Sequence, residues 1–320
     1  MEVSIIHTLY MMVGIPGSGK STYAKQVARA YNATVFSSDS YRMLVLGDET
    51  DQSNNQKVFD RLYKDMAFHL ENVGNAVFDA TNISVKTRAK AFNALGAIKY
   101  RKVAICCSTP IDECISRDKD RNRSVGESVI LKFVKQFEYP QFFEGFENIY
   151  EAEDLLGVTP KEKWETDLGA RADAISRMSG YDQNSKYHKY DVLTHSLVLS
   201  SFFNESWLNE SALFHDIGKT FTENVGEDGY SHYVGHANYS AYVLASNRKM
   251  LLLNKSPYFY PDGSHFFDII FVVNQHMHIR DIIKSEKAIG KYKKLWGKDK
   301  FNLMLKFMEF DNKSSGRIVE

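Results

Sequence analysis

Short apolar runs alternate with segments of helical periodicity over the first half of this 320-residue chain. Four of the runs have the length and composition of β-strands: Thr8–Val13, Thr34–Ser37, Ala76–Phe78 and Lys102–Cys106. Between the runs, three segments carry apolar residues at helical spacing: Ser21–Tyr31, Asn55–Leu70 and Thr87–Leu95. Strands that alternate with helices predict an α/β fold, in which a parallel sheet has helices on both faces.

The rest of the chain lacks this alternation and is expected to be all-α. Helical spacing first relates four apolar residues that we interpret as core packing: Ile130, Phe133, Val134 and Phe137. That helix must end near Pro140, because a proline inside a helix removes a backbone hydrogen bond. Residues 151–170 are charged and have no strong period, which indicates a junction. We therefore expect one domain at residues 1–150, a linker at 151–175 and a helical domain at 176–320.

The first strand run leads into a phosphate-cradle pattern, because the octapeptide from Gly14 to Ser21 has the form GxxxxGKS and precedes a predicted helix. Its glycines let backbone N–H groups close around phosphate oxygens, and the helix N-terminus adds partial positive charge. Lys20 is placed to reach the β and γ phosphates, and the Ser21 hydroxyl to bind Mg²⁺. An accidental glycine-rich turn does not account for every fixed position in this context. The residues assigned to ATP are Gly14, Gly17, Ser18, Gly19, Lys20, Ser21 and Thr22.

Polar residues follow the second and third strand runs, where ligands gather in an open parallel sheet. There the Asp39 carboxylate can accept the proton of an acceptor hydroxyl, and Arg42 can hold a phosphate. Asp79 can hold the metal through water or the nucleotide side of the site. Each aspartate alone would be read as a helix N-cap, and the adjoining phosphate cradle favours the functional interpretation.

A basic segment later in the same half is interpreted as a lid. Three arginines are interleaved with aspartates there: Arg117, Arg121 and Arg123. The alternative is a solvated helix face with internal ion pairs. We favour a lid that brings guanidinium groups onto the transferring phosphoryl group.

Over residues 8–150 these motifs resemble the polynucleotide kinase branch of the P-loop kinases. The matching segments are Gly-Ile-Pro-Gly-Ser-Gly-Lys-Ser-Thr, Asp39-Ser40-Tyr41-Arg42, Asp79-Ala80-Thr81-Asn82, the arginines before Val125, and Pro140 with Glu144-Gly145-Phe146. The resemblance implies that Asp39 is the general base for a 5′-hydroxyl and that Arg42 holds the acceptor-side phosphate. It also implies that a lid arginine contacts ATP, with Arg123 as the best match and Arg121 as the alternative. ATP and Mg²⁺ are the implied cofactors.

The second half contains an adjacent His215-Asp216 pair, with His195 upstream and Asp311 far downstream on predicted helices. Imidazole and carboxylate groups drawn from several helices are a divalent-metal site. Over residues 185–315 the pattern resembles the HD phosphohydrolase superfamily. The resemblance implies that these four residues bind metal, that His236 and His276 are further ligands, and that Lys219 lies near a substrate phosphate. For His188 and His232, phosphate contact and a structural role both stay open, and His69 and His278 are left without a role.

Composition and charge restrict the cellular compartment and the binding partners that we expect for the protein. The forty Lys and Arg residues balance the forty Asp and Glu residues, so the net charge is zero. A polyanion such as a nucleic acid would therefore have to bind at a local basic patch. Cys106, Cys107 and Cys114 are too few for a disulfide framework and indicate a reducing compartment. Neither a signal-peptide start nor an apolar stretch of about 18 residues is found, so we expect a cytoplasmic protein without a membrane partner.

Together the two resemblances imply an enzyme that heals nucleic-acid ends, with RNA favoured over DNA. The kinase would phosphorylate a 5′-hydroxyl, and the second domain would remove a 2′,3′-cyclic, 3′- or 2′-phosphate with a transition metal (Mn, Fe, Ni, Cu or Zn). Its expected partners are RNA or DNA ends and ATP, with a functional link to an RNA ligase. Two alternatives stay open: a small-molecule kinase, for example of nucleosides, fused to a nucleotide phosphohydrolase, and a non-catalytic nucleotide-sensing RNA-binding protein.

Overall fold

The computed structural model describes residues 6–121, 123–157, 167–251 and 265–316. The chain folds into two compact units. The first unit comprises residues 1–130 and 140–160, and the second comprises residues 131–139 and 161–320. Each unit is described by itself below.

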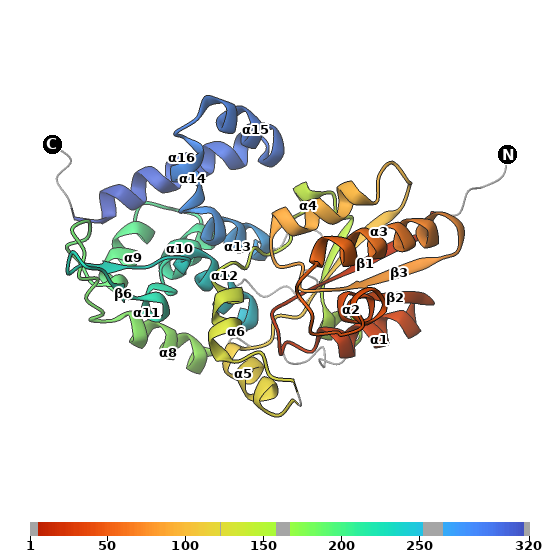
Figure 1. The fold of residues 1–320 in the computed structure, drawn as a ribbon. Coiled ribbons are helices and arrows are strands. Elements are labelled where there is room, and N and C mark those ends of the chain that lie inside the picture. Colours follow the sequence, from red (N-terminus) through yellow and green to blue (C-terminus); the bar gives the residue numbers. More distant parts are fainter. Residues whose placement is uncertain (1–5, 122, 158–166, 252–264, 317–320) are drawn as a thin grey trace. The chain divides into compact units, whose positions relative to one another are not determined.

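The first unit is built on a parallel sheet of five strands in the order β2-β3-β1-β4-β5 (Figure 1). The strands are β1 (Thr8–Val13), β2 (Ala33–Ser37), β3 (Asn75–Asp79), β4 (Arg101–Cys106) and β5 (Asn148–Glu151). The first four lie where the apolar runs predict them, and all six residues of β1 are buried. The α/β prediction is therefore confirmed, and β5 adds an edge strand that the sequence analysis did not identify.

Helices pack on both faces of this sheet, because successive side chains of a strand point to opposite sides. The helices of this unit are α1 (Lys20–Ala30), α2 (Ser38–Leu46), α3 (Asn55–Asn72), α4 (Val85–Ala94), α5 (Ile111–Lys119) and α7 (Ala152–Leu155), with a 3₁₀ turn η1 (Phe142–Glu144). A further helix, α6 (Glu127–Val134), begins in the first unit and continues into the second after Ile130. Tyr10 and Met12 of β1 share a core with Val27 of α1. On the other face the Phe78 ring meets Tyr63 of α3 at 5.8 Å. Figure 1 shows α3 and α4 on one side of the strands and α1 on the other.

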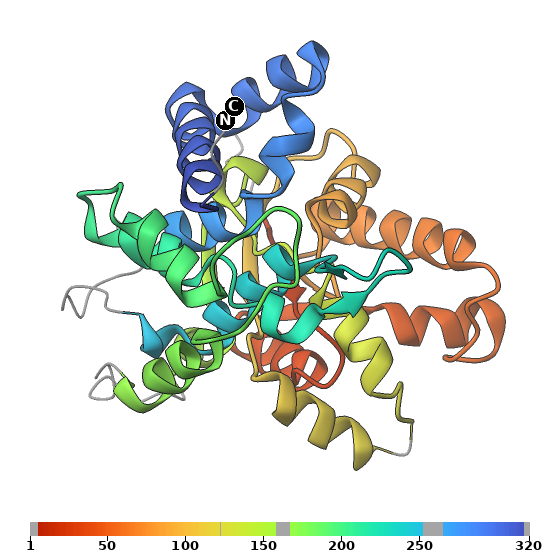
Figure 2. The ribbon, with the colours of Figure 1, turned by 90° about the vertical axis from the view of Figure 1, so that its left-hand side faces the viewer.

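The second unit is mainly helical, as expected. Its helices are α8 (Leu168–Met178), α9 (Val192–Ser200), α10 (Ser206–Phe214), α11 (Lys219–Thr222), α12 (His236–Ser246), α13 (Phe266–Gln275), α14 (His278–Ile282), α15 (Glu286–Trp296) and α16 (Lys298–Ser314), with a 3₁₀ turn η2 (Arg248–Met250). Figure 2 shows the last helices of the chain, in blue, lying beside one another. Caps fix several helix starts; the Asp191 side chain, for example, accepts a hydrogen bond from the Thr194 amide at 2.6 Å.

An antiparallel hairpin departs from the all-α expectation for this unit. It pairs β6 (Asn224–Val225) with β7 (Ser231–His232). Its turn uses Gly229 at φ 78°, and the Gly226 amide donates to the Tyr230 carbonyl at 2.8 Å. The strands are two residues long, too short for an alternating pattern, and therefore left no signal in the sequence.

The unit boundaries differ from the domain boundaries expected from the sequence. Residues 131–139, expected in the first domain, pack inside the second unit, where the Tyr139 amide donates to Asn274 Oδ1 at 3.1 Å. The Phe137 ring meets Tyr242 edge-on at 4.9 Å, so the apolar stripe after Val129 is core packing. Residues 151–155 of the expected linker complete β5 and form α7, and residues 168–175 belong to α8. The part of that linker at 158–166 lies outside the described residues.

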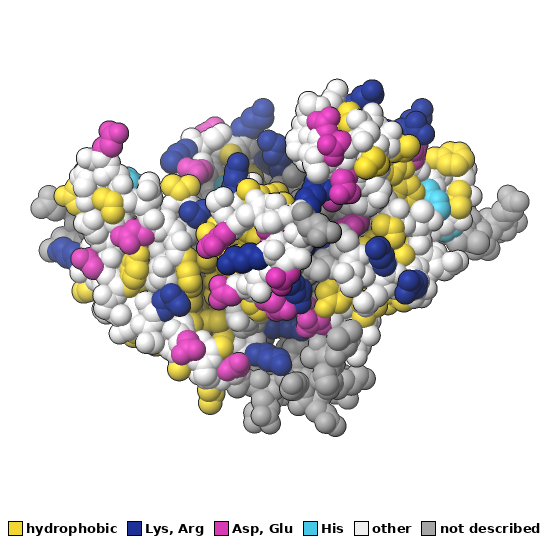
Figure 3. All heavy atoms as spheres, turned by 60° about the horizontal axis from the view of Figure 1, so that its bottom comes forward, with side chains coloured by type: hydrophobic (Ala, Val, Ile, Leu, Met, Phe, Trp, Pro, Cys, Tyr) yellow, Lys and Arg dark blue, Asp and Glu magenta, His cyan; other side chains and the backbone are white. Residues whose placement is uncertain are grey.

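Two surface properties bear on the expected setting. None of the described helices combines the length and apolar character that crossing a bilayer requires. On the face drawn in Figure 3, basic and acidic side chains are intermixed.

Candidate functional site

The GxxxxGKS segment forms a tight loop between β1 and α1, with Lys20 as the first residue of the helix. Gly17 and Gly19 have φ values of 81° and 83°, which side-chain-bearing residues rarely adopt. A Cβ at Gly17 would lie 2.3 Å from the Cys114 carbonyl oxygen, so only glycine fits there. The Ser18 hydroxyl is buried and has no hydrogen-bond partner among the described residues. These are the features of a backbone cradle for phosphate.

Lys20, Ser21 and Asp79 meet at the end of this loop. Burial lowers the pKa of Lys20, and its ammonium group donates to the Ile15 carbonyl at 2.7 Å. Burial raises the pKa of Asp79, while hydrogen bonding from Ser21 and the charge of Lys20 counteract that rise. A hydroxyl beside a carboxylate is an oxygen pair suited to Mg²⁺. The structure thus brings together the nucleotide-side residues that the sequence analysis named.

A buried ion pair supports that strand end. Arg88 is fully buried and donates to both oxygens of Glu144, at 2.7 and 2.8 Å. It also donates to the Asn82 carbonyl at 2.9 Å, and the Asn82 amide in turn reaches the Met12 carbonyl at 2.9 Å. The loop after β3 is thereby fixed to the end of β1. The sequence analysis quoted Glu144 only within a matching segment and missed Arg88, because the two lie 56 residues apart and share no local pattern.

The acceptor-side residues lie on α2. Arg42, which is buried, donates to Asp39 Oδ1 at 2.5 Å, and its Nε donates to Asn55 Oδ1 at 3.3 Å. Arg123 Nη1 lies 3.9 Å from the other Asp39 oxygen and 3.4 Å from Glu49 Oε1. The Asp39 side chain is 49% exposed, which leaves it accessible to an acceptor.

The three arginines of the expected lid do not face the same group. Asp118 fixes the base of the segment, because its buried carboxylate accepts from the Ser124 hydroxyl at 2.6 Å and from the Gly126 amide at 2.9 Å. Arg121 is near enough to Lys20 for its charge to help lower the pKa of that lysine, after burial as the main cause. Arg117 lies beside Gly19, with Nη1 3.4 Å from where a Cβ would be. Arg123, the sequence-based match for ATP contact, instead lies beside Asp39.

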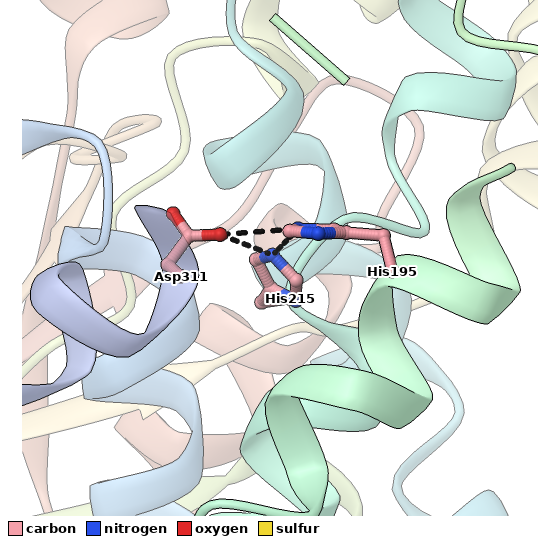
Figure 4. A group of neighbouring side chains, drawn as sticks. All are labelled: His195, His215 and Asp311. Carbon is pink, nitrogen blue, oxygen red and sulfur yellow. Dashed lines mark hydrogen bonds and ion pairs between the residues drawn. The ribbon is translucent and has the colours of Figure 1, made fainter. Parts of the chain in front are cut away.

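In the second unit, six predicted metal ligands converge from five helices. They are His195 on α9, His215 and Asp216 just after α10, His236 at the start of α12, His276 just after α13, and Asp311 on α16. Asp311 Oδ1 lies 3.0 Å from His195 Nε2 and 3.5 Å from His215 Nε2 (Figure 4). All six side chains are buried.

Asp216 connects two halves of this cluster. Its Oδ2 lies 3.2 Å from His215 Nε2 and 3.5 Å from His195 Nε2. Its Oδ1 lies 3.1 Å from His236 Nε2 and 3.6 Å from His276 Nε2. Ligand atoms around one ion are separated by roughly 2.8–3.6 Å when bonds are about 2.0–2.2 Å long, so these spacings suit two neighbouring ions.

The outer nitrogens of the four imidazoles fix their tautomers. The Nδ1 atoms of His215, His236 and His276 lie 2.7–2.8 Å from backbone carbonyl oxygens, which only accept, so each Nδ1 carries the proton. The Ser314 hydroxyl donates to the Asp311 carbonyl at 2.8 Å and therefore accepts from His195 Nδ1 at 3.1 Å. In its neutral form each of the four rings then presents a lone pair on Nε2, as metal-bound histidines do.

The Nε2 atoms face one another in pairs, and each pair needs a proton or a metal ion between its nitrogens. His195 and His215 approach with Nε2 atoms 3.3 Å apart, and His236 and His276 with Nε2 atoms 3.1 Å apart. Burial disfavours the charged form of His215. The neighbouring Asp216 and Asp311 carboxylates outweigh this effect and raise the pKa of His215 to about 10, so the site favours a positive charge. A divalent ion satisfies both the lone pairs and the carboxylates, so the donor set fits a metal.

A pocket of about 790 Å³ adjoins the cluster, and Asp216, His236, His276 and Asp311 form part of its lining. Two cations flank it: Lys219 Nζ lies 2.6 Å from Asp216 Oδ2, and Arg280 Nη2 lies 2.6 Å from Asp311 Oδ2. Arg280 Nε is buried and has no hydrogen-bond partner among the described residues.

The remaining histidines and the supporting residues of the cluster lie as follows. His188 stacks edge-on against His195 at 4.8 Å, whereas His232 lies beside Asp228 on the hairpin.

Arg280 and Ser314 were not identified from the sequence. Ser314 lies three residues after Asp311 on the same side of α16, and this spacing could have marked it. Arg280 lies four residues after His276 but on the next helix, α14, so its spacing gave no such signal.

Comparison with known proteins agrees with the fold of the first unit. Residues 9–140 match the model of a family described as an AAA domain, and the parallel sheet and phosphate loop make this part a P-loop kinase-like domain. A search of curated proteins gave no match.

Several solved structures are similar to part of the chain. A chain of the Pnkp1/Rnl/Hen1 RNA repair complex is 23% identical over 42% of this chain and 45% of its own length, with a TM-score of 0.38. APS kinase CysC from Mycobacterium tuberculosis is 20% identical over 48% of this chain and 95% of its own (TM-score 0.33). Shikimate kinase from Acinetobacter baumannii is 16% identical over 48% and 91% (TM-score 0.34). This chain thus spans less than half of the RNA-repair chain.

Proposed function

We propose that the protein is a bifunctional end-healing enzyme that phosphorylates a nucleic-acid 5′-hydroxyl with ATP and removes a phosphate from a 2′ or 3′ end. The observation that carries the proposal is the cluster of four imidazoles and two carboxylates in a chain that also holds a phosphate cradle. A kinase alone does not need a second buried donor set. Adding a 5′-phosphate and clearing a terminal phosphate are the two reactions that prepare a broken strand for a ligase.

In the first unit, the residues support an in-line transfer of the γ-phosphoryl group. The Asp39 carboxylate accepts the proton of the attacking hydroxyl while the new P–O bond forms and the bond between the β–γ bridging oxygen and the γ-phosphorus breaks. Lys20 neutralises charge on the transferring group, and Ser21 with Asp79 would hold the Mg²⁺ that accompanies ATP. Arg42 would hold an acceptor-side phosphate with the guanidinium N–H groups that it does not donate to Asp39.

In the second unit, His195, His215, Asp216 and Asp311 would hold one ion, and Asp216, His236 and His276 a second. A transition metal bound there supplies hydroxide near neutral pH and polarises a phosphoryl oxygen. Lys219 and Arg280 flank the same pocket and can neutralise the phosphate that enters it. The buried backbone carbonyls that fix the Nδ1 protons of His215, His236 and His276 keep these rings oriented toward the centre.

Matched RNA oligonucleotides test the proposal. One carries a 5′-hydroxyl, and others carry a 2′,3′-cyclic, a 3′- or a 2′-phosphate; free nucleosides and nucleoside monophosphates serve as comparison substrates. We expect ATP-dependent 5′ phosphorylation with Mg²⁺ and metal-dependent phosphate release at the other end. Saturation by free nucleosides without preference for oligonucleotides would instead identify a small-molecule kinase, and a lack of both reactions would leave a binding protein.

A further inference from the structure

The pocket beside the metal cluster is larger than a phosphate group needs. Its volume of about 790 Å³ is in the range of pockets that enclose a whole small molecule. The cluster occupies only one part of the lining, which continues along residues 185–188 and 230–238. A ligand whose phosphate lies at the cluster therefore extends into the rest of this pocket, the compartment lined by those two segments.

Aromatic side chains line that compartment. They are Tyr187, Tyr230 and Tyr233, here called the aromatic rim. Tyr187 is 65% exposed and Tyr230 is 36% exposed, so both can offer ring surface to a ligand. Exposed aromatic faces beside a phosphate site are the usual stacking surfaces for nucleobases.

The rim is held in place before any ligand enters. Asn184, at a φ of 39°, donates to the Gly229 carbonyl at 3.0 Å and accepts from the Ser231 amide at 3.0 Å. These two bonds fix the segment that carries Tyr187 to the hairpin that carries Tyr230. The Tyr233 hydroxyl donates to the Gln183 carbonyl at 2.7 Å, which fixes the third ring. A preformed surface loses little conformational entropy when a ligand binds.

Polar groups beside the rings favour a nucleobase over a plain apolar group. Lys186 Nζ lies over one face of the Tyr230 ring, 4.4 Å from its centre and 3.7 Å from Asp228 Oδ2, so a base would stack on the opposite face of that ring. His232 Nε2 lies 3.3 Å from Asp228 Oδ1, so donors and an acceptor are grouped next to the stacking surface. A nucleobase has both a flat apolar face and a polar edge, which match this arrangement.

We propose that the aromatic rim binds the nucleobase of the terminal nucleotide whose phosphate lies at the metal cluster. This inference rests on the proposed phosphohydrolase function and names its substrate class: nucleotide ends rather than base-free phosphate esters. Tyr187 and Tyr230 supply the stacking surface, and Lys219 with the cluster takes the phosphate. The rim therefore determines specificity and affinity and leaves the bond-breaking step unchanged.

The test compares adenosine 3′-phosphate with methyl ribofuranoside 3-phosphate. The second compound keeps the sugar and the phosphate and carries a methoxy group in place of the base. Full-length enzyme is assayed with the transition metal that supports hydrolysis, as wild type, Tyr187→Ala, Tyr230→Ala and the double variant. Tyr190→Ala is the matched control, because Tyr190 is 41% exposed and lies outside the pocket lining. Stacking on one aromatic ring predicts that the double variant raises KM for the nucleotide roughly tenfold or more. Its kcat, and both constants for the base-free ester, should stay within about twofold of wild type.

The outcomes separate this inference from the function on which it rests. Equal kcat/KM of the wild type for the two esters, or equal losses on both in the double variant, would overturn the role of the rim while leaving the phosphohydrolase in place. No hydrolysis of either ester with any of the expected metals would overturn the phosphohydrolase itself. In that case the dissociation constant of adenosine 3′-phosphate, measured by calorimetry on wild type and double variant, still tests the rim: an unchanged value overturns it.

Discussion

The two candidate sites of this protein are built in opposite ways. The phosphate cradle is one contiguous segment whose shape is set by backbone and glycine conformations. The metal cluster takes side chains from helices spread over more than a hundred residues, and its backbone contributes only by fixing Nδ1 protons. A site made by the backbone tolerates changes at many side chains, whereas a site made by side chains depends on each ligand. The following predictions test that difference, beginning with the largest expected effect.

Replacing Asp216 should have the largest effect, because its two oxygens face both halves of the metal cluster. Asp216→Ala should lower phosphate release by roughly 10³-fold or more, as expected when several kcal/mol of metal-ion stabilisation is lost. The 5′-kinase rate should stay within about twofold. Both rates are measured on one preparation, with circular dichroism to confirm folding and Asp216→Asn as a variant of similar shape. Equal loss of both activities in a folded variant would refute separate sites.

Lys20→Ala and Asp39→Ala should each abolish most kinase activity while sparing phosphate release. Loss of Lys20 removes charge stabilisation worth about 2.7–4 kcal/mol, and loss of Asp39 removes a general base worth about 10²–10⁴-fold. Single-turnover phosphorylation of a 5′-hydroxyl oligonucleotide measures both. A full rate for Asp39→Ala would remove Asp39 from the mechanism.

The metal content should respond to ligand removal in two steps. Chelator-treated protein should regain phosphate release with a transition metal better than with Mg²⁺, because imidazole prefers softer ions. Elemental analysis should find up to two such ions per chain, and one in the His236→Ala/His276→Ala double variant. An unchanged count would make those two histidines packing or substrate-contact residues. A metal-free wild type that releases phosphate with Mg²⁺ alone would contradict a transition-metal site.

Removing the hydroxyl that orients His195 should have a moderate effect. Ser314→Ala leaves His195 Nδ1 without its acceptor, and losing such a partner typically weakens metal binding about 10–100-fold. The metal dissociation constant is measured by competition with a chromogenic chelator. Ser315→Ala is the matched control, because that hydroxyl bonds only its own helix end at Asn312 in the described residues. Equal affinities of the Ser314 variant and the wild type would show that the hydroxyl does not support the ligand.

The lid arginines should give the smallest effects, because they are partly exposed. Arg123→Ala should raise KM for the acceptor a few-fold, since Arg123 lies beside Asp39, while Arg121→Ala should raise KM for ATP. Steady-state kinetics with each substrate varied separates the two. The reverse assignment would place Arg123 on ATP, as the sequence resemblance implies.

The sequence predicted what depends on local pattern. The strands of the first unit follow apolar runs, and the loop with Lys20 follows a motif in which each position has its own physical reason. Asp39 and Asp79 were found because strand ends in a parallel sheet meet at one edge. The cluster ligands were named through resemblance to a family, since residues on separate helices have no common period.

Contacts between distant residues were beyond this kind of reasoning. The Arg88–Glu144 pair joins positions 56 residues apart, and no local sequence pattern around either residue indicates its partner. The hairpin at Asn224–His232 is held by Asn184, and its strands are too short to alternate. The aromatic rim likewise depends on distant contacts, because Tyr187 and Tyr230 line one pocket although 43 residues separate them along the chain.

The path of residues 131–139 has a consequence for how this protein can be divided. The chain passes between its two units at 130/131, 139/140 and 160/161, so the units are interleaved rather than placed in series. A gene fragment that ends at residue 150 would retain Phe137 and Tyr139 without the aromatic rings they pack against, and a fragment that begins at 151 would lack that segment. Either piece would expose apolar surface and tend to aggregate. Recombination that exchanged one unit for another would therefore have to carry this nine-residue segment with the second unit. The two units are for that reason harder to exchange than two domains joined by one linker.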